Sequence, residues 1–431
     1  MSVLDRAVGK SMRRLLPFIV LMYTLAFLDR ANVGFGKQAL QADTGLSDAA
    51  FAFGAGIFFV GYALFEVPSN IILERVGAKM WMCRIMVTWG LVATAMMFAW
   101  NETVFYVLRF LLGVTEAGFF PGVILYLTYW FPERTRGQAT GFFYFGVPLA
   151  LVVGGPLSGF LLDWHGMGGL TGWQWMFLIE GLLASAVGVW AYFWLDNGPK
   201  DAKWLSPDER TALSAELAGE NEAKVHHTPS GILAGLTSGR VLYLTTAFFF
   251  IQIAAYGLIF YLPTIVATYL GQKVGLTVGL VTTIPWIASI IGIYFVTRWS
   301  DQSGNRRGLI TSLYVLLALS LFASPYLGTV LGVAALCVAA AAYCSATPLF
   351  WTVCTANLNR TSAPAGIALI GAVGNLGGFV APIYKNWVET QAGAAAGMVA
   401  IGSTALIGAA MVHLLRRPET ATERLAPAHI A

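Results

Sequence analysis

The sequence predicts an all-α integral membrane protein whose twelve transmembrane helices form two pseudo-symmetric six-helix bundles. Its composition, the length of its uncharged segments and the placement of its basic residues each support this fold class. Of the 431 residues, 57% are hydrophobic and only 11% are charged, whereas soluble domains carry about 25% charged residues. So few charges cannot cover a surface that faces water, which excludes a soluble enzyme. Because 13% of the residues are aromatic, the composition also excludes a disordered chain.

Uncharged segments define six helices in the second half, because a spanning helix needs about 20 mostly apolar residues. No Asp, Glu, Lys or Arg occurs within 241–272, 274–297, 308–359, 361–384 or 390–415. The third of these segments is long enough for two helices, and Ser324-Pro325 divides it near its middle. We therefore expect helices over 241–268, 276–298, 308–324, 329–351, 363–386 and 394–415.

The first half predicts six more helices, although several of them carry a charge at mid-depth. Their expected ranges are 15–36, 51–73, 81–100, 104–126, 138–162 and 175–195. Runs this long and this uniformly apolar exclude a membrane β-barrel, whose strands alternate over about ten residues.

Basic residues orient the twelve helices, which together place both termini on one side of the membrane. Twenty-one of the 26 Lys and Arg residues lie in the terminal segments and loops of that side. Only Lys37, Lys273 and Lys385 are assigned to loops on the other side, and Arg30 and Arg109 lie within helices. Because Lys and Arg concentrate in cytoplasmic loops, we expect a multi-pass protein of the bacterial inner membrane with both termini in the cytoplasm.

One long polar stretch divides the chain into its parts. It begins at Asn197-Gly198-Pro199 and separates the sixth helix from the seventh. We expect an N-terminal six-helix bundle over 1–195, a cytoplasmic linker loop over 196–240, a C-terminal six-helix bundle over 241–415 and a cytoplasmic tail over 416–431.

Two loops on the terminal side share the pattern acid-x-x-Gly-x-base. One runs from Glu74 to Lys79 after the second helix, and the other runs from Asp301 to Arg306 after the eighth. Glycine permits a tight turn, and an acid and a base at the helix ends can bridge to a neighbouring helix. We predict a cytoplasmic latch, with a chance match between ordinary basic loops as the alternative, formed by Glu74, Arg75, Gly77, Lys79, Asp301, Gly304 and Arg306.

Two six-helix halves, a long central loop and this duplicated loop motif resemble the major facilitator superfamily over nearly the whole chain. The resemblance implies a binding site near the middle of the membrane, between the two halves. It also implies transport by alternating access, in which the halves rock around that site.

Four ionisable side chains remain at mid-membrane depth, and all of them lie in the first half. An ionisable residue there costs about 2.5–3.5 kcal/mol on insertion scales, so each one is a functional candidate. Glu66 and Glu180 also lie within helices, and we interpret both as structural partners. The four candidates are Asp29, Arg30, Arg109 and Glu116.

The candidates differ in the chemistry they offer. Arg30 presents a planar fork that suits a carboxylate, so we predict an anion ligand, with a structural ion pair as the alternative. Side chains of neighbouring helical residues point about 100° apart, so Asp29 and Arg30 are expected to face different partners. Glu116 lies among small residues and is the first choice for a coupling proton site. Asp29 is the second choice, and Arg109, which shares a helix face with Glu116, is expected to modulate either.

Motifs in four helices resemble the anion:cation symporter family. Its members include proton-coupled importers of sugar acids, tartrate and aromatic carboxylates. The resemblance implies that Arg30 holds the substrate carboxylate, that Asp29 and Glu116 exchange protons, and that Tyr62 lines the site. The family also includes the vesicular glutamate transporters, and this sequence differs from them because its predicted seventh helix has no Arg. The motifs are Leu28-Asp29-Arg30-Ala31-Asn32, Gly61-Tyr62, Glu66-Val67-Pro68-Ser69-Asn70, Arg109-Phe110-Leu111-Leu112-Gly113, Glu116-Ala117-Gly118, Tyr129-Trp130-Phe131-Pro132 and Gly374-Asn375-Leu376-Gly377-Gly378.

Neutral side chains are expected to complete the binding site. Gln252 and Asn375 are the stronger candidates, because an amide in hydrocarbon needs a partner. For the aromatic candidates, packing between helices or against lipid is the alternative. These are Tyr256, Trp286 and Trp351 in the second half, and Tyr144, in the aromatic run of the fifth helix, is a further candidate.

These observations predict a proton-coupled symporter that takes up an organic carboxylate, namely a hydroxy-acid, a sugar acid or an aromatic acid. The alternative is an antiporter or a sodium-coupled carrier. We expect no enzyme, because no nucleophile, metal or cofactor constellation is visible. A receptor would need a signalling domain, which the central loop is too short to contain. The expected partners are a small organic anion, protons as the coupling ion and membrane lipid, with no cofactor and no nucleic acid, and we expect a monomer.

Overall fold

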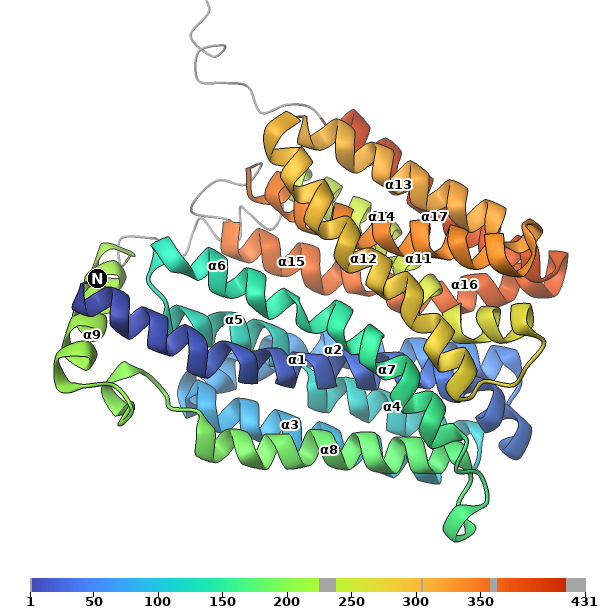
Figure 1. Ribbon diagram of the computed structural model, residues 1–431, viewed down its shortest axis with the longest axis horizontal. Coiled ribbons are helices and arrows are strands. Elements are labelled where there is room, and N and C mark those ends of the chain that lie inside the picture. The colour runs from blue at the N-terminus through green and yellow to red at the C-terminus, as the bar shows by residue number, and fades with distance from the viewer. Residues whose placement is uncertain (1, 225–237, 304, 357–362, 416–431) are drawn as a thin grey trace, which may run out of the picture.

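The computed structural model of the protein describes residues 2–224, 238–303, 305–356 and 363–415. Within these ranges every regular element is a helix, and the membrane-length helices lie roughly side by side along the long axis of the molecule (Figure 1). Eleven helical segments in the described part of the chain are long and apolar enough to cross a membrane. The predicted fold class, an all-α membrane protein, is confirmed.

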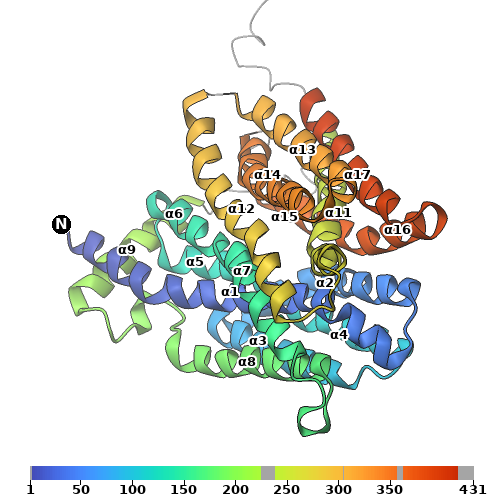
Figure 2. The same ribbon diagram turned by 45° about the vertical axis from the view of Figure 1, so that its right-hand side comes forward.

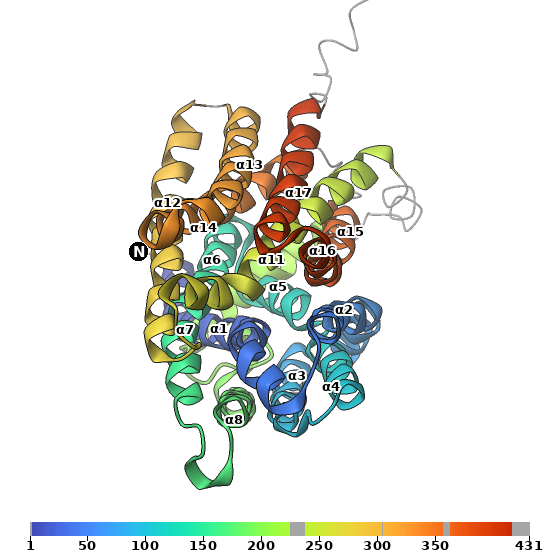
Figure 3. The same cartoon turned by 90° about the vertical axis from the view of Figure 1, so that its right-hand side faces the viewer.

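The helices form two halves, which Figure 3 shows one above the other. The second half contains α11 (Gly239–Leu270), α12 (Leu276–Ser303), α13 (Arg306–Ala323), α14 (Gly328–Ala356), α15 (Ala363–Asn375), α16 (Gly377–Ala392) and α17 (Ala394–Leu414). The first half contains α1 (Val3–Thr44), α2 (Asp48–Val76), α3 (Ala78–Ala95), α4 (Glu102–Glu116), α5 (Phe119–Trp130), α6 (Glu133–Tyr144), α7 (Gly146–Leu162) and α8 (Gly172–Trp194).

The first helix is much longer than predicted, because capping residues rather than charges set its ends. Ser2 and Asp5 form a capping box at its start, and Gly45, with a φ of 72°, closes its last turn. The sequence limits the apolar segment to 15–36, but the helix continues through the charged residues on both sides and reaches 42 residues. Lys37 therefore lies within α1, not in a loop, and Lys385 likewise lies within α16.

Three of the twelve expected spans are broken within the membrane-length segment. The fourth is interrupted at Ala117–Gly118, between α4 and α5, and the fifth at Phe145, between α6 and α7. The eleventh, expected over 363–386, is divided at Leu376 into α15 and α16. The eleven segments of membrane length in the described part of the chain include the divided fourth and fifth spans but not this one.

The polar stretch between the halves contains a helix, and its Ser206-Pro207-Asp208-Glu209 segment has the residue pattern of a helix start. This helix, α9 (Pro207–Lys224), lies beside the start of α1 (Figure 1). Lys10 Nζ is 2.8 Å from Glu209 Oε1, and Arg136 Nη2 is 3.0 Å from Glu220 Oε2. The first part of the stretch therefore docks on the first half, while 225–237 lies outside the described residues. The four predicted domain boundaries remain predictions.

The two halves meet most closely at the end opposite to the one where α1 begins. We call the latter the terminal end, and the other the opposite end. Three helix pairs cross between the halves there: α1 with α11, α2 with α16, and α7 with α12 (Figure 3). Glycine permits these approaches, because a Cβ atom at Gly34, Gly56, Gly155 or Gly279 would overlap with the backbone of the facing helix. Small residues serve the same purpose in other membrane helix pairs.

Candidate functional site

The centre of the candidate site is an ion pair between α1 and α4. Arg30 Nη2 lies 2.6 Å from Glu116 Oε1, and Arg30 Nε donates a hydrogen bond of 2.7 Å to the same oxygen. Both side chains are buried, with Glu116 fully enclosed. The second carboxylate oxygen, Glu116 Oε2, has no hydrogen-bond partner among the described residues. The two residues expected to bind an anion and a proton are thus joined to each other.

The break in the fourth span positions Glu116 at the end of a helix. Gly118 has a φ of 86°, which favours glycine, and a Cβ atom there would overlap with Ser69 Oγ. Ser69 Oγ in turn donates a 2.7 Å hydrogen bond to the carbonyl oxygen of Ala117, which the break leaves free, and accepts one of 3.0 Å from Trp81 Nε1. The motifs around Ser69 and Glu116 therefore form one structural unit.

Aromatic rings surround the guanidinium of Arg30. Its Cζ lies 4.8 Å from the ring centroid of Tyr62, 5.2 Å from that of Phe27 and 5.4 Å from that of Phe58, all within the range of cation–π attraction. Tyr256 of α11 interacts electrostatically with Arg30, so the second half also contributes a residue to the site. Tyr256 also packs against Phe59 of α2, with ring centroids 4.5 Å apart.

Asp29 points away from Arg30 and joins a different network. Trp89 Nε1 donates a hydrogen bond of 2.5 Å to Asp29 Oδ2, and Asn32 Nδ2 lies 3.4 Å from Asp29 Oδ1. Asn32 Nδ2 also donates a 3.0 Å hydrogen bond to Glu180 Oε2, and Ser158 Oγ donates one of 2.8 Å to Glu180 Oε1. The helical spacing predicts that Asp29 and Arg30 face different partners, and they do.

Arg109 forms hydrogen bonds with the backbone of α2 rather than an ion pair with Glu116. Its Nε and Nη2 donate hydrogen bonds of 3.2 and 3.0 Å to the carbonyl oxygens of Gly54 and Ala55. No ion pair joins Arg109 to Glu116 in the described part of the chain, although the two interact electrostatically. Arg109 also interacts in this way with Asp29. Arg109 therefore influences Glu116 and Asp29 through electrostatics at longer range, not through the direct contact that a shared helix face suggests for Glu116.

The predicted amides of the second half lie together. Gln252 Nε2 donates a 2.9 Å hydrogen bond to Asn375 Oδ1, and Tyr343 OH of α14 donates one of 3.1 Å to Gln252 Oε1. The break at Leu376 ends α15 at Asn375 and allows Gly377 to approach Gln252. Gln252 and Tyr256 are one turn apart on α11, so this polar cluster adjoins the side chain that contacts the Arg30 site.

The remaining aromatic candidates are dispersed. Tyr144 ends α6 and lies against Phe120 and Phe143, with ring centroids 5.8 and 6.0 Å away. Trp351 packs against Phe248, and Trp286 is buried on α12. The described contacts of Trp351 are with other rings, which is what the packing alternative expects.

The predicted latch is only partly described. Gly77 joins α2 to α3 with a φ of 98°, and Arg75 lies in the last turn of α2. Lys79 Nζ lies 5.0 Å from the ring centroid of Tyr192 in α8, a contact within the first half. Arg306 begins α13. The side chains of Glu74 and Asp301, and all of Gly304, lie outside the described residues.

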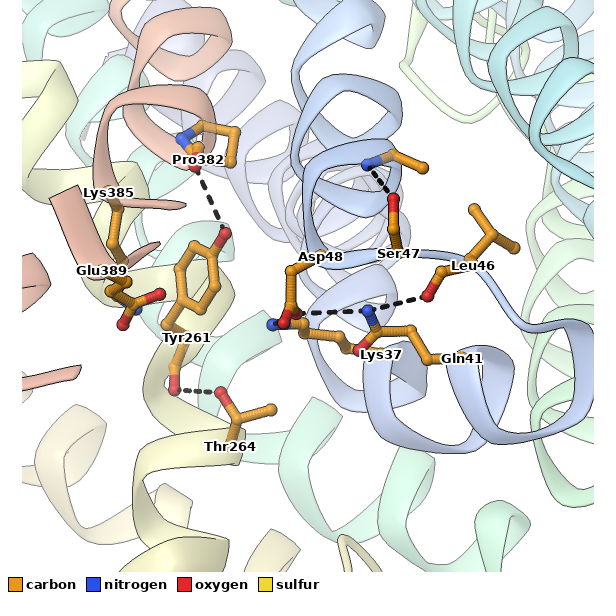
Figure 4. Close-up of polar contacts among 11 residues, drawn as sticks. Lys37, Gln41, Leu46, Ser47, Asp48, Tyr261, Thr264, Pro382, Lys385 and Glu389 are labelled. Carbon is orange, nitrogen blue, oxygen red and sulfur yellow. Dashed lines mark hydrogen bonds and ion pairs between the residues drawn. The ribbon is translucent and has the colours of Figure 1, made fainter. Parts of the chain in front are cut away.

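Charged side chains close the opposite end in an arrangement the sequence does not predict (Figure 4). Lys37 Nζ of α1 is 2.8 Å from Asp48 Oδ1 of α2, and Lys385 of α16 pairs with Glu389 one turn further on. The ring of Tyr261 lies between these pairs, with its centroid 5.1 Å from Lys37 Nζ and 3.9 Å from Lys385 Nζ. We call these five residues the opposite-end cluster.

Several residues of the site escape prediction from sequence. Asn32 has a signal, because an amide three residues after Asp29 lies on the same helix face. Trp89, Ser158 and Tyr343 have none, since their contacts depend on how distant helices pack. Glu180 is expected to be a structural partner, but its hydrogen bonds place it in the Asp29 network.

Known proteins resemble this chain along nearly its full length. The "Inner membrane transport protein RhmT" of Escherichia coli (strain K12) is 45% identical over 423 residues, which cover 98% of each chain. A "Putative tartrate transporter" of Agrobacterium vitis is 43% identical and covers 95% of this chain and 94% of its own. A "Quinolone resistance transporter" of Acinetobacter baumannii is 40% identical and covers 95% of each.

The family model described as Major Facilitator Superfamily matches residues 19–382 and 266–429. The match includes the helices that carry Arg30, Glu116 and the amide cluster of the second half. Its extent and the identity of the relatives exclude an enzyme: the chain is a transporter and belongs to the major facilitator superfamily.

Proposed function

We propose that the protein is a proton-coupled symporter that takes up an organic carboxylate through the inner membrane by alternating access. The observation that carries this proposal is the buried ion pair between Arg30 and Glu116. A carboxylate substrate needs the same guanidinium that Glu116 now occupies. Binding of substrate and ionisation of Glu116 are therefore in competition.

Protonation of Glu116 resolves this competition. A neutral Glu116 no longer pairs with Arg30, and the substrate carboxylate takes its place beside the guanidinium. Leaving Arg30 buried without a partner is costly by several kcal/mol, since an unpaired ion in a protein interior is poorly solvated. Arg30 therefore exchanges one carboxylate for another, and each arriving anion requires a proton on Glu116.

The remaining polar groups favour a substrate with hydroxyl or further carboxyl oxygens. Gln252, Asn375 and Tyr343 offer donors and acceptors on the second half, close to Tyr256. The relative whose name includes tartrate, a hydroxy-dicarboxylate, supports the same class. Hydroxy-acids, sugar acids and aromatic acids remain the proposed substrates, with Tyr62 and Tyr144 supplying aromatic surface.

The electrical balance requires protons for an inward flow of anions. Moving an anion inward against a negative-inside potential costs about 2.3 kcal/mol of free energy for each elementary charge and each 100 mV. Two or more protons per monovalent anion make entry favourable. With the terminal end in the cytoplasm, as the basic residues predict, the contacts at the opposite end correspond to an inward-facing state. The predicted latch would close the terminal end in the outward-facing state.

Reconstitution in liposomes tests the proposal. We expect an inward proton gradient to drive accumulation of radiolabelled tartrate. If tartrate does not accumulate, we expect accumulation of a radiolabelled sugar acid or aromatic acid. Arg30→Ala should abolish binding of that anion to the purified protein, and Arg30→Lys should restore it only in part, because an ammonium lacks the planar fork. Binding that survives Arg30→Ala contradicts the proposed anion ligand.

An antiporter is the second candidate, because one relative is named for quinolone resistance. In quinolone export by an antiporter, protons would enter the cell while the drug leaves it. Everted vesicles distinguish the two functions: an antiporter accumulates norfloxacin when the vesicle interior is acidic, whereas the proposed symporter does not.

A further inference from the structure

A second buried acidic network lies next to the Arg30 site, and of its members only Asp29 is already predicted to exchange protons. It consists of Asp29 and Asn32 on α1, Trp89 on α3, Ser158 on α7 and Glu180 on α8. Each of these side chains is almost completely buried, and both Asp29 and Glu180 are at most 1% exposed. A single amide nitrogen, Asn32 Nδ2, lies between the two carboxyl groups, at 3.4 Å from Asp29 Oδ1 and 3.0 Å from Glu180 Oε2.

No cation forms an ion pair with Asp29 or Glu180 within the described residues, and Arg109 acts on Asp29 only at longer range. Helix α8 packs against α1, α3 and α7 (Figure 2). On α1, Arg30 is paired with Glu116, and α7 has no ionisable residue. The basic residues of α3 lie more than one turn from Trp89, towards the terminal end. Arg109 and Glu116 on α4 interact electrostatically with Asp29, and Asp29 in turn interacts electrostatically with Glu180.

Two carboxylates that share one amide cannot both remain ionised without strong repulsion. Two negative charges that both lie against one amide group repel strongly in a poorly solvated interior, and carboxyl groups that share one site in other proteins hold a proton for this reason. Proton binding thus belongs to the Asp29–Glu180 pair as a whole rather than to either residue.

The amide of Asn32 provides an independent sign that a proton belongs here. Its carbonyl oxygen, Oδ1, is buried and has no donor, although buried acceptors in proteins are nearly always satisfied. If the amide turns over, Oδ1 faces the carboxyl groups and accepts a hydrogen bond from a protonated one. The amide nitrogen donates to an ionised carboxylate, and the amide oxygen accepts from a carboxylic acid. The orientation of the Asn32 amide can therefore change with the protonation of the two carboxyl groups.

We propose that Glu180 and Asn32 join Asp29, whose proton exchange the sequence already predicts, in a second proton-binding site that loads and releases a proton in each transport cycle. The step moves one proton between water and a carboxylate oxygen of the Asp29–Glu180 pair, and no electrons are transferred. The part of the proposal that concerns the cycle rests on the proposed symport, whereas proton binding itself does not.

The position of Ser158 connects this site to the contact between the halves. Ser158 bonds Glu180, while its neighbours Gly155 and Gly159 on α7 approach the backbone of α12 in the second half. Rocking of α12 past α7 must disturb this segment. The site therefore lies where a change in its protonation can influence the opening of the opposite end.

Infrared difference spectroscopy of the protein in liposomes tests proton binding without any substrate. On acidification, the wild type should gain a carbonyl band of a buried carboxylic acid. Glu180→Gln should remove such a band, and Ser158→Ala should shift it to higher frequency, because it loses the hydrogen bond from Ser158 Oγ. The control is Glu102→Gln, an exposed carboxyl at the start of α4, which should leave the bands unchanged. The same spectrum for the wild type and Glu180→Gln overturns the proposal.

The transport cycle is tested by the ratio of protons to substrate, measured with the anion that the wild type accumulates. Glu180→Gln should carry one proton fewer per anion and still exchange labelled for unlabelled anion. A purely structural role would slow transport and leave the ratio unchanged, which contradicts the cyclic role. If the wild type moves no proton with any anion, the proposed symport fails, while the infrared result still decides whether Glu180 binds a proton.

Discussion

Arg30 and Glu116 meet through one carboxylate oxygen. Both Arg30 Nη2 and Nε lie within 2.7 Å of Glu116 Oε1, and Glu116 Oε2 has no partner in the described part of the chain. A two-oxygen fork would hold the pair more firmly. The observed geometry instead leaves one oxygen available to a proton, and protonation there would weaken the hold on Arg30.

Glu116→Gln should uncouple transport from protons. The amide keeps the shape of the side chain but cannot ionise, so Arg30 is permanently available to the substrate. We expect anion binding that is at least as tight as in the wild type and independent of pH, measured by isothermal titration calorimetry. Accumulation driven by a proton gradient should be lost, while exchange of internal for external anion should persist.

Glu102→Gln is the matched control for this substitution, because it removes a carboxylate from the exposed start of the same helix. It should accumulate substrate as the wild type does. If Glu116→Gln still concentrates substrate under a pH gradient, Glu116 is not the coupling site.

Gly118→Ala should destabilise the break in the fourth span. Alanine at a φ of 86° is strained, which costs about 1–2 kcal/mol, and its Cβ would overlap with Ser69 Oγ. We expect a lower unfolding temperature in a fluorescence-based thermal assay, together with reduced transport, because the break orients Glu116. Gly141→Ala is the control, since open space surrounds Gly141 within α6. Equal stability of the two variants would contradict this account of the break.

The sequence predicts the fold because hydrophobic length and the distribution of basic residues act locally. Helix ends are less predictable: α1 continues past Lys37 because Gly45 provides its cap. The break at Leu376 lies among the glycines of Gly374-Asn375-Leu376-Gly377-Gly378. Glycine weakens a helix, but it also serves close packing within unbroken membrane helices, so the sequence alone does not place a break there.

The sequence predicts only those site residues whose charge is unusual within a membrane-spanning helix. Arg30 and Glu116 are prominent because ionisable residues are rare in hydrocarbon. Their partnership is not predictable, because it depends on where the folded bundle places α4 relative to α1. The same holds for Ser158 and Glu180, which come from helices whose spacing along the chain says nothing about their approach in space.

Tyr261→Leu should loosen the opposite end. The ring lies between Lys37 and Lys385, and each cation–π contact stabilises by about 0.5–2 kcal/mol. Without the ring the two ammonium groups repel each other directly, and the population open at this end should rise by up to roughly tenfold. Spin labels at Ala49 and Gln391, in a variant without native cysteines, report this opening as a longer distance in double electron–electron resonance.

Tyr261→Phe is the control for the ring, because it keeps the aromatic face and loses only the 3.5 Å hydrogen bond to the carbonyl oxygen of Pro382. Its distance distribution should match that of the wild type. A wild-type distribution in Tyr261→Leu would show that the ring does not hold the halves together.

Lys10→Ala should loosen α9 at neutral pH but not at acidic pH. The hydrogen bond from Lys10 lowers the pKa of Glu209 below its usual value of 4.5. A depressed pKa means that the stabilisation is complete above the usual value and is lost as the pH falls through the depressed one. Hydrogen–deuterium exchange in α9 should therefore be faster in the variant than in the wild type at neutral pH, and the difference should vanish once Glu209 is protonated. A difference that persists in acid would mean that Lys10 supports α9 by packing rather than by charge.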